Sequence, residues 1–355
     1  MATISNVNGK KITKIKYKGE IFDTGGGGSE GDVNPLQHII DNHKGDGQPS
    51  GEDLFYEYWG SSLDNVIPYC DFSGITSAKQ MFYDCKNLKS VPYFDTSNCT
   101  DMSSMFNSCS NLTTLPQLNT SNVNKMSSMF SHCDNLITIP LFDTSKVTNM
   151  SSMFQYCSKL TTIPQLDTSS VTDMSFMFYQ CSNLPTISQF NTSKVTTMSR
   201  MFWNCQKLTT IPQLDTSSVT DMSIMFKNCS DLTTIKLDTS KVTNMSSMFE
   251  GCLQLTTIDI THMNFTSTYN STYFAQYCYS LTKLIIRNMS TIPVLNSSAF
   301  YECYHFTGTT NATYNPTGAK DGRIYVPDDK VEALKTATNW SVYADIIVPL
   351  STLVE

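Results

Sequence analysis

Apolar side chains recur along this chain at a nearly constant interval of 24 residues. The interval is marked by a Met-Phe pair with a cysteine three residues after the Phe, a pattern that eight units carry from Met81-Phe82 to Met248-Phe249. The repeated cysteines are separated by 24 residues six times and then by 23, 26 and 25: Cys85, Cys109, Cys133, Cys157, Cys181, Cys205, Cys229, Cys252, Cys278 and Cys303. A period of this length predicts a solenoid of stacked coils.

Each unit changes from helical to strand spacing along its length. Four apolar residues stand at i, i+3, i+4 and i+7, which predicts a two-turn helix with one buried face; in one unit they are Met150, Met153, Phe154 and Cys157. The β-branched run at 160–163, stopped by Pro164, predicts a short strand. The polar stretch 167–169 predicts a turn. Since one coil cannot bury its own apolar face, we expect about ten α/β coils to stack.

The composition supports a buried core and disfavours two classes of protein. Hydrophobic residues form 40% of the 355 positions and charged residues only 15%, so uncharged polar residues must form most of the surface. The formal net charge is −7 and no dense Lys/Arg cluster alternates with aromatic residues, which disfavours nucleic-acid binding. No apolar run is long enough to predict membrane insertion, and the first residues lack the apolar core of a secretory signal.

The repeated unit resembles a known family. The order Asp-Thr-Ser-x-Val-Thr-x-Met-Ser-x-Met-Phe-x-x-Cys-x-x-Leu, read at residues 143–160, is similar to the BspA-like leucine-rich repeat family of bacterial surface proteins and phage proteins. The resemblance covers roughly residues 66–310 and implies a leucine-rich-repeat-like solenoid that serves recognition, not catalysis. Residues 322–345 look like the closing cap of such arrays. Units after Cys252 lose the Met-Phe pair, and Pro185 is displaced, so their register is less certain.

We predict five segments from these patterns. They are a β attachment segment at 1–24, a Gly-rich linker at 25–34, an N-terminal cap at 35–65, the solenoid at 66–310 and a C-terminal cap at 311–355. The first segment alternates lysines with apolar residues, which predicts a β-hairpin or edge strand with Asn8-Gly9 as its turn. It is either a frayed terminus or an anchor that pairs with another protein.

Residue types that commonly carry catalysis or metals do not form a recognisable site. Five histidines fall at unrelated positions of the repeat, so the solenoid brings no pair of them together as a base and its orienting partner: His38, His43, His132, His262 and His305. One core-facing cysteine per coil, with no Cys-x-x-Cys, predicts buried reduced thiols rather than disulfides or a zinc site. The recurring Asp of Asp-Thr-Ser predicts turn hydrogen bonds rather than a cation site. We therefore expect no enzyme, no cofactor and no metal.

Three consecutive units differ from the others at two outward positions. Most units carry small or polar residues two after the first Met and just after the Phe, as at Ser152 and Gln155. The exceptions, with Tyr156 at their border, are Phe176 and Tyr179, Arg200 and Trp203, and Ile224 and Lys227. Each pair is spaced i, i+3 and should share the outer face of its predicted helix. Such a patch suits a sugar ring or a protein hot spot; contact with a neighbouring subunit and surface drift are the alternatives.

The sequence thus predicts a non-enzymatic recognition or structural protein. The favoured setting is a phage virion, as a head or tail fibre or decoration that binds host-surface glycan or protein, because a virion protein needs no export signal. The alternatives are a bacterial surface adhesin that binds host proteins, on the cell surface or secreted, and a purely architectural virion protein. Expected partners are other virion proteins through residues 1–24, a host glycan or protein, and a second copy of the chain; nucleic acid and membrane insertion are not expected.

Overall fold

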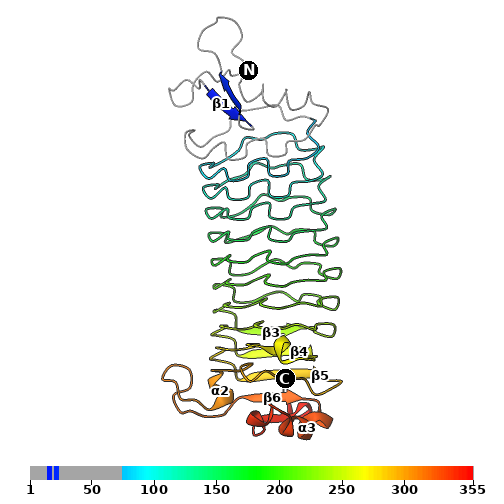
Figure 1. Cartoon of the computed structure of the whole chain (residues 1–355), viewed down its shortest axis with the longest axis vertical. Helices are drawn as coiled ribbons and strands as arrows, with labels where there is room; N and C mark the ends of the chain where they lie inside the picture. The colour runs from blue at the N-terminus through cyan, green and yellow to red at the C-terminus, as the bar shows by residue number, and fades with distance from the viewer. Residues whose placement is uncertain (1–13, 18–19, 24–73, 355) are drawn as a thin grey trace, which may run out of the picture. The chain divides into compact units, whose positions relative to one another are not determined.

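Stacked coils form the body of the protein, in two compact units. The computed structural model describes residues 14–17, 20–23 and 74–354, and the chain divides into Met1–Ser170 and Val171–Glu355. Within each unit, successive repeats form successive coils (Figure 1), so the predicted leucine-rich-repeat-like solenoid is confirmed. The predicted linker at 25–34, the cap at 35–65 and Cys70 lie outside the described residues.

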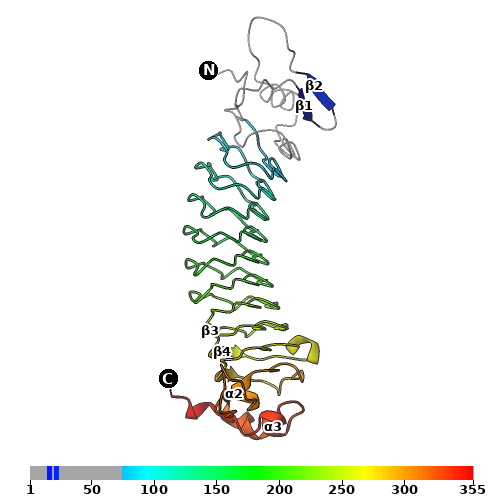
Figure 2. The same cartoon turned by 90° about the vertical axis from the view of Figure 1, so that its left-hand side faces the viewer.

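The N-terminal segment contains the predicted hairpin. Strands β1 (Lys14–Tyr17) and β2 (Glu20–Asp23) pair antiparallel, with Ile15 opposite Phe22 (Figure 2). Residues 18 and 19 lie between the two strands, and the predicted turn at Asn8-Gly9 lies outside the described residues. The role of residues 1–24 as an attachment segment stays a prediction.

The interior of both units is built from the repeated Met, Phe, Cys and Leu side chains, as predicted. In the first unit, the rings of Phe106 and Phe130 stack with centroids 5.8 Å apart and planes 4° apart. In the second, Phe202 and Phe226 stack at 5.5 Å and 8°. All four side chains are fully buried. Each such pair adds about 0.5–1.5 kcal/mol to the free energy of burial, so the phenylalanine column stabilises the stacking of one coil on the next.

The predicted two-turn helix does not form, because its backbone N–H groups alternate between two kinds of acceptor. The N–H groups of Met105, Asn107 and Cys109 donate to the carbonyl three residues back in the same coil, at 3.1–3.2 Å. Those of Ser104, Phe106 and Ser108 donate to carbonyls of the next coil, at 2.7–2.9 Å. An α-helix requires every N–H to reach four residues back. The segment is therefore a run of tight turns, although its four apolar side chains are buried as predicted.

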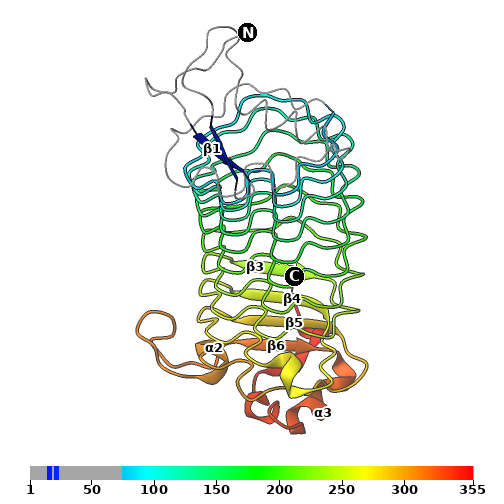
Figure 3. The same cartoon turned by 45° about the horizontal axis from the view of Figure 1, so that its top comes forward.

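Within the repeats at residues 74–310, regular strands occur only where the proline that ends the β-branched run is missing, as in the units of residues 234–237, 257–262 and 283–288. The parallel sheet contains β3 (Thr234–Leu237), β4 (Thr257–His262), β5 (Lys283–Asn288), β6 (Arg323–Val326) and β7 (Ile347–Pro349), in that order. Figure 3 shows β3 to β6 stacked one after another. In most earlier coils a proline such as Pro164 or Pro212 stands in this run and has no N–H to donate. The strand predicted at residues 160–163 is therefore wrong, and an extended run with single inter-coil hydrogen bonds takes its place.

The Asp-Thr-Ser stretches form the predicted turns. The backbone N–H of Ser145 donates to Asp143 Oδ1 at 3.0 Å and its hydroxyl donates to the same oxygen at 2.7 Å. These bonds hold the pKa of the Asp143 carboxyl below its usual value. Thr144, the residue between Asp143 and Ser145, donates from Oγ1 to the carbonyl of Asp167 in the next coil at 2.8 Å. The aspartate column thus shapes turns.

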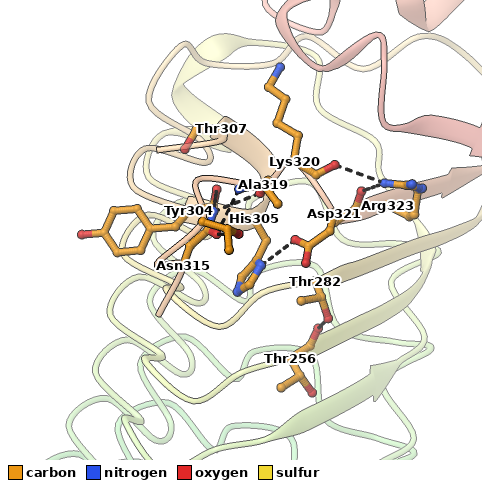
Figure 4. Close-up of polar contacts among 12 residues, drawn as sticks. Thr256, Thr282, Tyr304, His305, Thr307, Asn315, Ala319, Lys320, Asp321 and Arg323 are labelled. Carbon is orange, nitrogen blue, oxygen red and sulfur yellow. Dashed lines mark hydrogen bonds and ion pairs between the residues drawn. The ribbon is translucent and has the colours of Figure 1, made fainter. Parts of the chain in front are cut away.

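Short helices and a long loop complete the second unit. The 3-10 helices are η1 (Thr268–Ser271), η2 (Asp328–Lys330), η3 (Ser341–Tyr343) and η4 (Leu350–Thr352), and the α-helices are α2 (Tyr304–Thr307) and α3 (Val331–Thr336). The loop after α2 is fastened by Asn315, whose Nδ2 donates to the carbonyls of Tyr304 and Ala319 (Figure 4). His305 Nδ1 lies 2.7 Å from Asp321 Oδ1 at its far end.

Candidate functional site

The described residues offer no cluster of the kind that holds a metal ion. No group of three or more His, Cys, Asp or Glu side chains converges within residues 74–354 or the hairpin. No helix in the described part of the chain is long and apolar enough to cross a membrane. The search for a site therefore turns to the surface of the coils.

The cysteines serve the stacking of the coils. All eleven cysteines in residues 74–354 are free thiols and buried, as predicted. Cys205 Sγ donates to the carbonyl of Phe178 and Cys229 Sγ to that of Phe202, both at 3.0 Å and both across to the preceding coil. Burial raises the pKa of these thiols well above its ordinary value. A thiol that stays protonated and inaccessible is a poor nucleophile.

The second unit brings the six predicted patch residues together on the outside of the tight turns. The backbone N–H of Phe178 donates to Met201, and that of Phe202 to Met225, both at 2.9 Å. These bonds set three coils in step, so equivalent positions lie side by side. Phe176, Arg200 and Ile224 then form one column, and Tyr179, Trp203 and Lys227 a second, all half-buried. We call the outer side of these turns in residues 171–303 the turn face.

Side chains of the turn face pack against one another. The rings of Tyr179 and Trp203 stack with centroids 4.4 Å apart and planes 21° apart. Phe176 meets Tyr179 edge to face at 6.0 Å, and the Arg200 guanidinium lies 5.1 Å from the centre of the Phe176 ring. The aromatic rings therefore contact one another and the Arg200 guanidinium, and these contacts fix the positions of the side chains.

The backbone beneath the first column favours other residue types. Phe176, Arg200 and Ile224 have φ of 57°, 60° and 61°, in the left-handed region. The first unit has serine at this position, as at Ser104 and Ser128 with φ of 55°. The left-handed conformation costs a residue with a side chain about 1–2 kcal/mol, and a β-branched residue such as isoleucine rarely adopts it. Residues kept against their local conformational preference often mark functional sites.

The turn face extends further than the sequence predicted. Backbone bonds from Ser247 to Thr272 and from Gly251 to Gln276 place Tyr273 in the first column on the next coil, and Tyr277 beside the second column, directly before Cys278 as Asn228 stands before Cys229. Tyr273 has φ of 55° and Tyr277 of 61°. Tyr301 follows on the coil after that, and its ring meets Tyr277 at 6.0 Å. Tyr273 and Tyr301 are among the most exposed large side chains of the described chain.

These tyrosines escaped the sequence analysis because the marker used for alignment is lost. Phe274-Ala275 replaces Met-Phe, and the interval between cysteines lengthens to 26 residues. Counting back from the cysteine finds them: Tyr273 precedes Cys278 by five residues, as Phe176 precedes Cys181. The cysteine is the better reference because its buried thiol fixes the register.

Tyr156 belongs to the first unit. It stands directly before Cys157, at φ of 62°, so it occupies a different column from Tyr179. Its ring stacks on His132 at 4.2 Å and 14°. Its place at the border of the patch stays a prediction.

Lys227 carries an ion pair that the sequence analysis did not anticipate. Its Nζ lies 2.8 Å from Glu250 Oε1, and Glu250 holds the equivalent position on the next coil. The lysine charge is therefore neutralised within the turn face. Arg200 Nη1 donates to the Ser199 hydroxyl at 3.2 Å, and no ion pair of Arg200 occurs within the described residues.

Comparison with known proteins assigns the repeats to a family whose description names no activity. The model of the family described as "Mycoplasma protein of unknown function, DUF285" matches residues 52–138, 135–234 and 209–313. No curated protein matches the chain by sequence.

Two of the solved structures that are similar to the chain are bacterial leucine-rich proteins. A leucine-rich cell surface protein from Faecalibacterium prausnitzii shares 20% identity, covers 95% of this chain and 85% of its own, and has a TM-score of 0.44. A leucine-rich repeat protein from Bacteroides ovatus shares 17% identity, covers 81% of this chain and 76% of its own, and has a TM-score of 0.41.

Proposed function

We propose that this chain, which belongs to the DUF285 family, is a non-enzymatic recognition protein that binds a protein partner through its turn face. The observation that carries the proposal is the ordered column of Tyr179, Trp203 and Lys227 beside the left-handed Phe176, Arg200 and Ile224. In the first column, these bulky residues stand where the first unit has smaller side chains such as Ser104 and Ser128. Their presence is better explained by a partner than by folding.

The arrangement favours a protein over a sugar as the partner. Tyr, Trp and Arg are the residue types that dominate protein–protein hot spots. A sugar ring needs an open aromatic face, and one face each of Tyr179, Trp203 and Phe176 is already taken by the ring stack or by Arg200. Side chains already fixed by packing lose little conformational entropy on binding. A glycan is therefore the weaker of the two expected ligands.

The setting that we propose is a bacterial cell surface. Of the proteins reported above, one is described as a cell surface protein and none as a phage or virion protein. None of these proteins supports the virion setting expected from the sequence, so we favour the alternative of a bacterial surface adhesin. Partners at residues 1–24 and contact between copies stay predictions.

The test is binding of the full chain to arrayed, individually purified extracellular proteins, with a glycan array in parallel. Tyr179→Ser combined with Trp203→Ser should reduce binding at least tenfold, because it removes the stacked pair of the hot spot. Gln155→Ser, at the equivalent position in the first unit, is the matched control and should bind like the unaltered chain. Circular dichroism checks that both variants keep the fold. Undiminished binding by the double variant, or specific signals on the glycan array alone, would overturn the proposal.

A further inference from the structure

Two polar atoms of the turn face are buried without a hydrogen-bond partner. They are Trp203 Nε1 and Glu250 Oε2, on coils that flank the coil of Lys227. An unpaired buried donor or acceptor costs about 1–3 kcal/mol, and native proteins keep few of them. Among the described residues, the third such atom is Thr120 Oγ1. Two of the three therefore lie on one small surface.

The third atom has a structural explanation, which the other two lack. Thr120 belongs to a column of threonines that donate to a carbonyl of the next coil, as Thr96 does to Asn119 and Thr144 to Asp167 at 2.8 Å. The coil geometry thus requires a hydroxyl at its position. Nothing in the repeat requires an indole N–H at Trp203, where other coils have Asn107 or Gln155.

A second tryptophan, Trp340, shows that a buried indole N–H with a structural role has a hydrogen-bond acceptor in this fold. Trp340 is fully buried, and its Nε1 donates to the carbonyl of Pro293 at 2.9 Å. Trp203 is only half-buried and stands at the surface, so small side-chain adjustments that keep the stack on Tyr179 can expose its N–H to a ligand without backbone change. The contrast points to a partner from outside for Trp203.

The unpaired Glu250 Oε2 lies on the coil that carries the smallest side chains of the turn face. Its Oε1 binds Lys227, while Oε2 is unpaired. Ser247 and Gly251 flank it at φ of 52° and 75°, and at Gly251 a Cβ would overlap the Asn228 side chain. Because Lys227 already neutralises the carboxylate, a neutral N–H suits Oε2 better than a second cation, which the lysine would repel.

On the basis of the proposed function, we infer that the turn face binds an extended segment of its protein partner through that segment's peptide groups. A carbonyl oxygen of the segment accepts from Trp203 Nε1, and a backbone N–H donates to Glu250 Oε2. Two coil steps separate the residues, about 10 Å at the usual strand spacing. Three residues of extended chain cover that distance at about 3.3 Å each.

The first test follows the indole N–H signals of the full ¹⁵N-labelled chain by NMR. Trp203→Phe assigns the Trp203 signal, and Trp340, already paired, is the internal control. The probe is N-methylacetamide, which carries one peptide group. It should shift the Trp203 signal and leave that of Trp340 in place. No shift at Trp203, or a shift produced by methyl glucoside and not by the amide, would overturn the inference.

The second test separates this inference from the proposed function. Trp203→Phe keeps an aromatic ring beside Tyr179 and removes the N–H together with part of the indole. Its melting temperature should stay close to that of the unaltered chain, because removal of an unpaired buried donor offsets the lost ring contact. Its affinity for proteins found on the array should fall about five- to tenfold. If Trp203→Phe binds fully while the double serine variant does not, the hydrogen-bond inference fails and the proposed function stands. If neither variant changes binding, the proposed function fails.

Discussion

Ile224 occupies a backbone conformation that a β-branched side chain rarely adopts. Its φ is 61°, and the equivalent residues Phe176 and Arg200 are also left-handed. The equivalent position is left-handed on each coil from Gln80 to Tyr273, whatever residue stands there, and the inter-coil hydrogen bonds hold it in this conformation. Sequence comparison within the chain identifies the exceptions, and the backbone gives their energetic cost. At the scale of the residue, the first column of the patch thus carries bulky side chains on a backbone conformation that residues with side chains adopt only at an energetic cost.

Replacing Ile224 by asparagine should therefore stabilise the protein. Asparagine tolerates the left-handed region, so we expect the free energy of unfolding to rise by roughly 1 kcal/mol, measured by urea denaturation. Ser247→Asn, at an equivalent position without a β-branched residue, is the control and should change stability little. A loss of stability in Ile224→Asn would mean that isoleucine packing outweighs the backbone cost.

The tight-turn segment is the element that holds neighbouring coils together. Half of its N–H groups bond within the coil and half bond to the next one. The Phe carbonyl at its centre accepts twice, as Phe178 does from the N–H of Cys181 at 3.0 Å and from the thiol of Cys205 at 3.0 Å. The repeated cysteine is therefore a small buried donor that links two coils, which explains its place in every unit without redox or metal chemistry.

Removal of one such thiol should weaken the second unit measurably. Cys205→Ala deletes the bond to Phe178 and leaves a small void, so we expect a loss of about 1–2 kcal/mol in chemical denaturation. Cys205→Ser keeps a donor at the same place and should lose less. The hydrogen-bond account would be wrong if the serine variant were the less stable of the two.

At the scale of the whole molecule, the many buried thiols couple stability to alkaline pH. Burial raises the pKa of Cys99 from 9.0 to about 12, and it also raises the pKa values of cysteines in the repeated column, such as Cys133 and Cys278. In the unfolded chain the same thiols ionise near pH 9. Below that pH both states keep their protons, so the stabilisation is complete. Above it only the unfolded state loses protons, so stability falls as pH rises toward 12.

The urea midpoint should accordingly stay level from pH 7 to about 8.5 and decline above pH 9, in the presence of a reductant. Each thiol contributes at most about 1.4 kcal/mol per pH unit. Cys99→Ala should show a shallower decline than the unaltered chain, which separates thiols from the tyrosines and lysines that titrate in the same range. A midpoint unchanged up to pH 10 would contradict this account.

The sequence alone determined the period, the buried columns and the type of fold. Burial of one apolar face depends only on the spacing of Met, Phe, Cys and Leu, and that spacing is explicit in the chain. It also identified six residues of the turn face, because a repeat protein carries its own internal comparison. It failed for Tyr273, Tyr277 and Tyr301, where the Met-Phe marker is absent.

Only the tertiary structure decided the backbone path and the contacts of the surface. Spacing at i, i+3, i+4 and i+7 fits both a helix and a run of tight turns, and the choice depends on whether N–H groups find acceptors in the next coil. That coil is distant in sequence and absent from any local pattern. The same holds for the Tyr179–Trp203 stack and the Lys227–Glu250 pair, since residues on different coils meet only once the coils are in register.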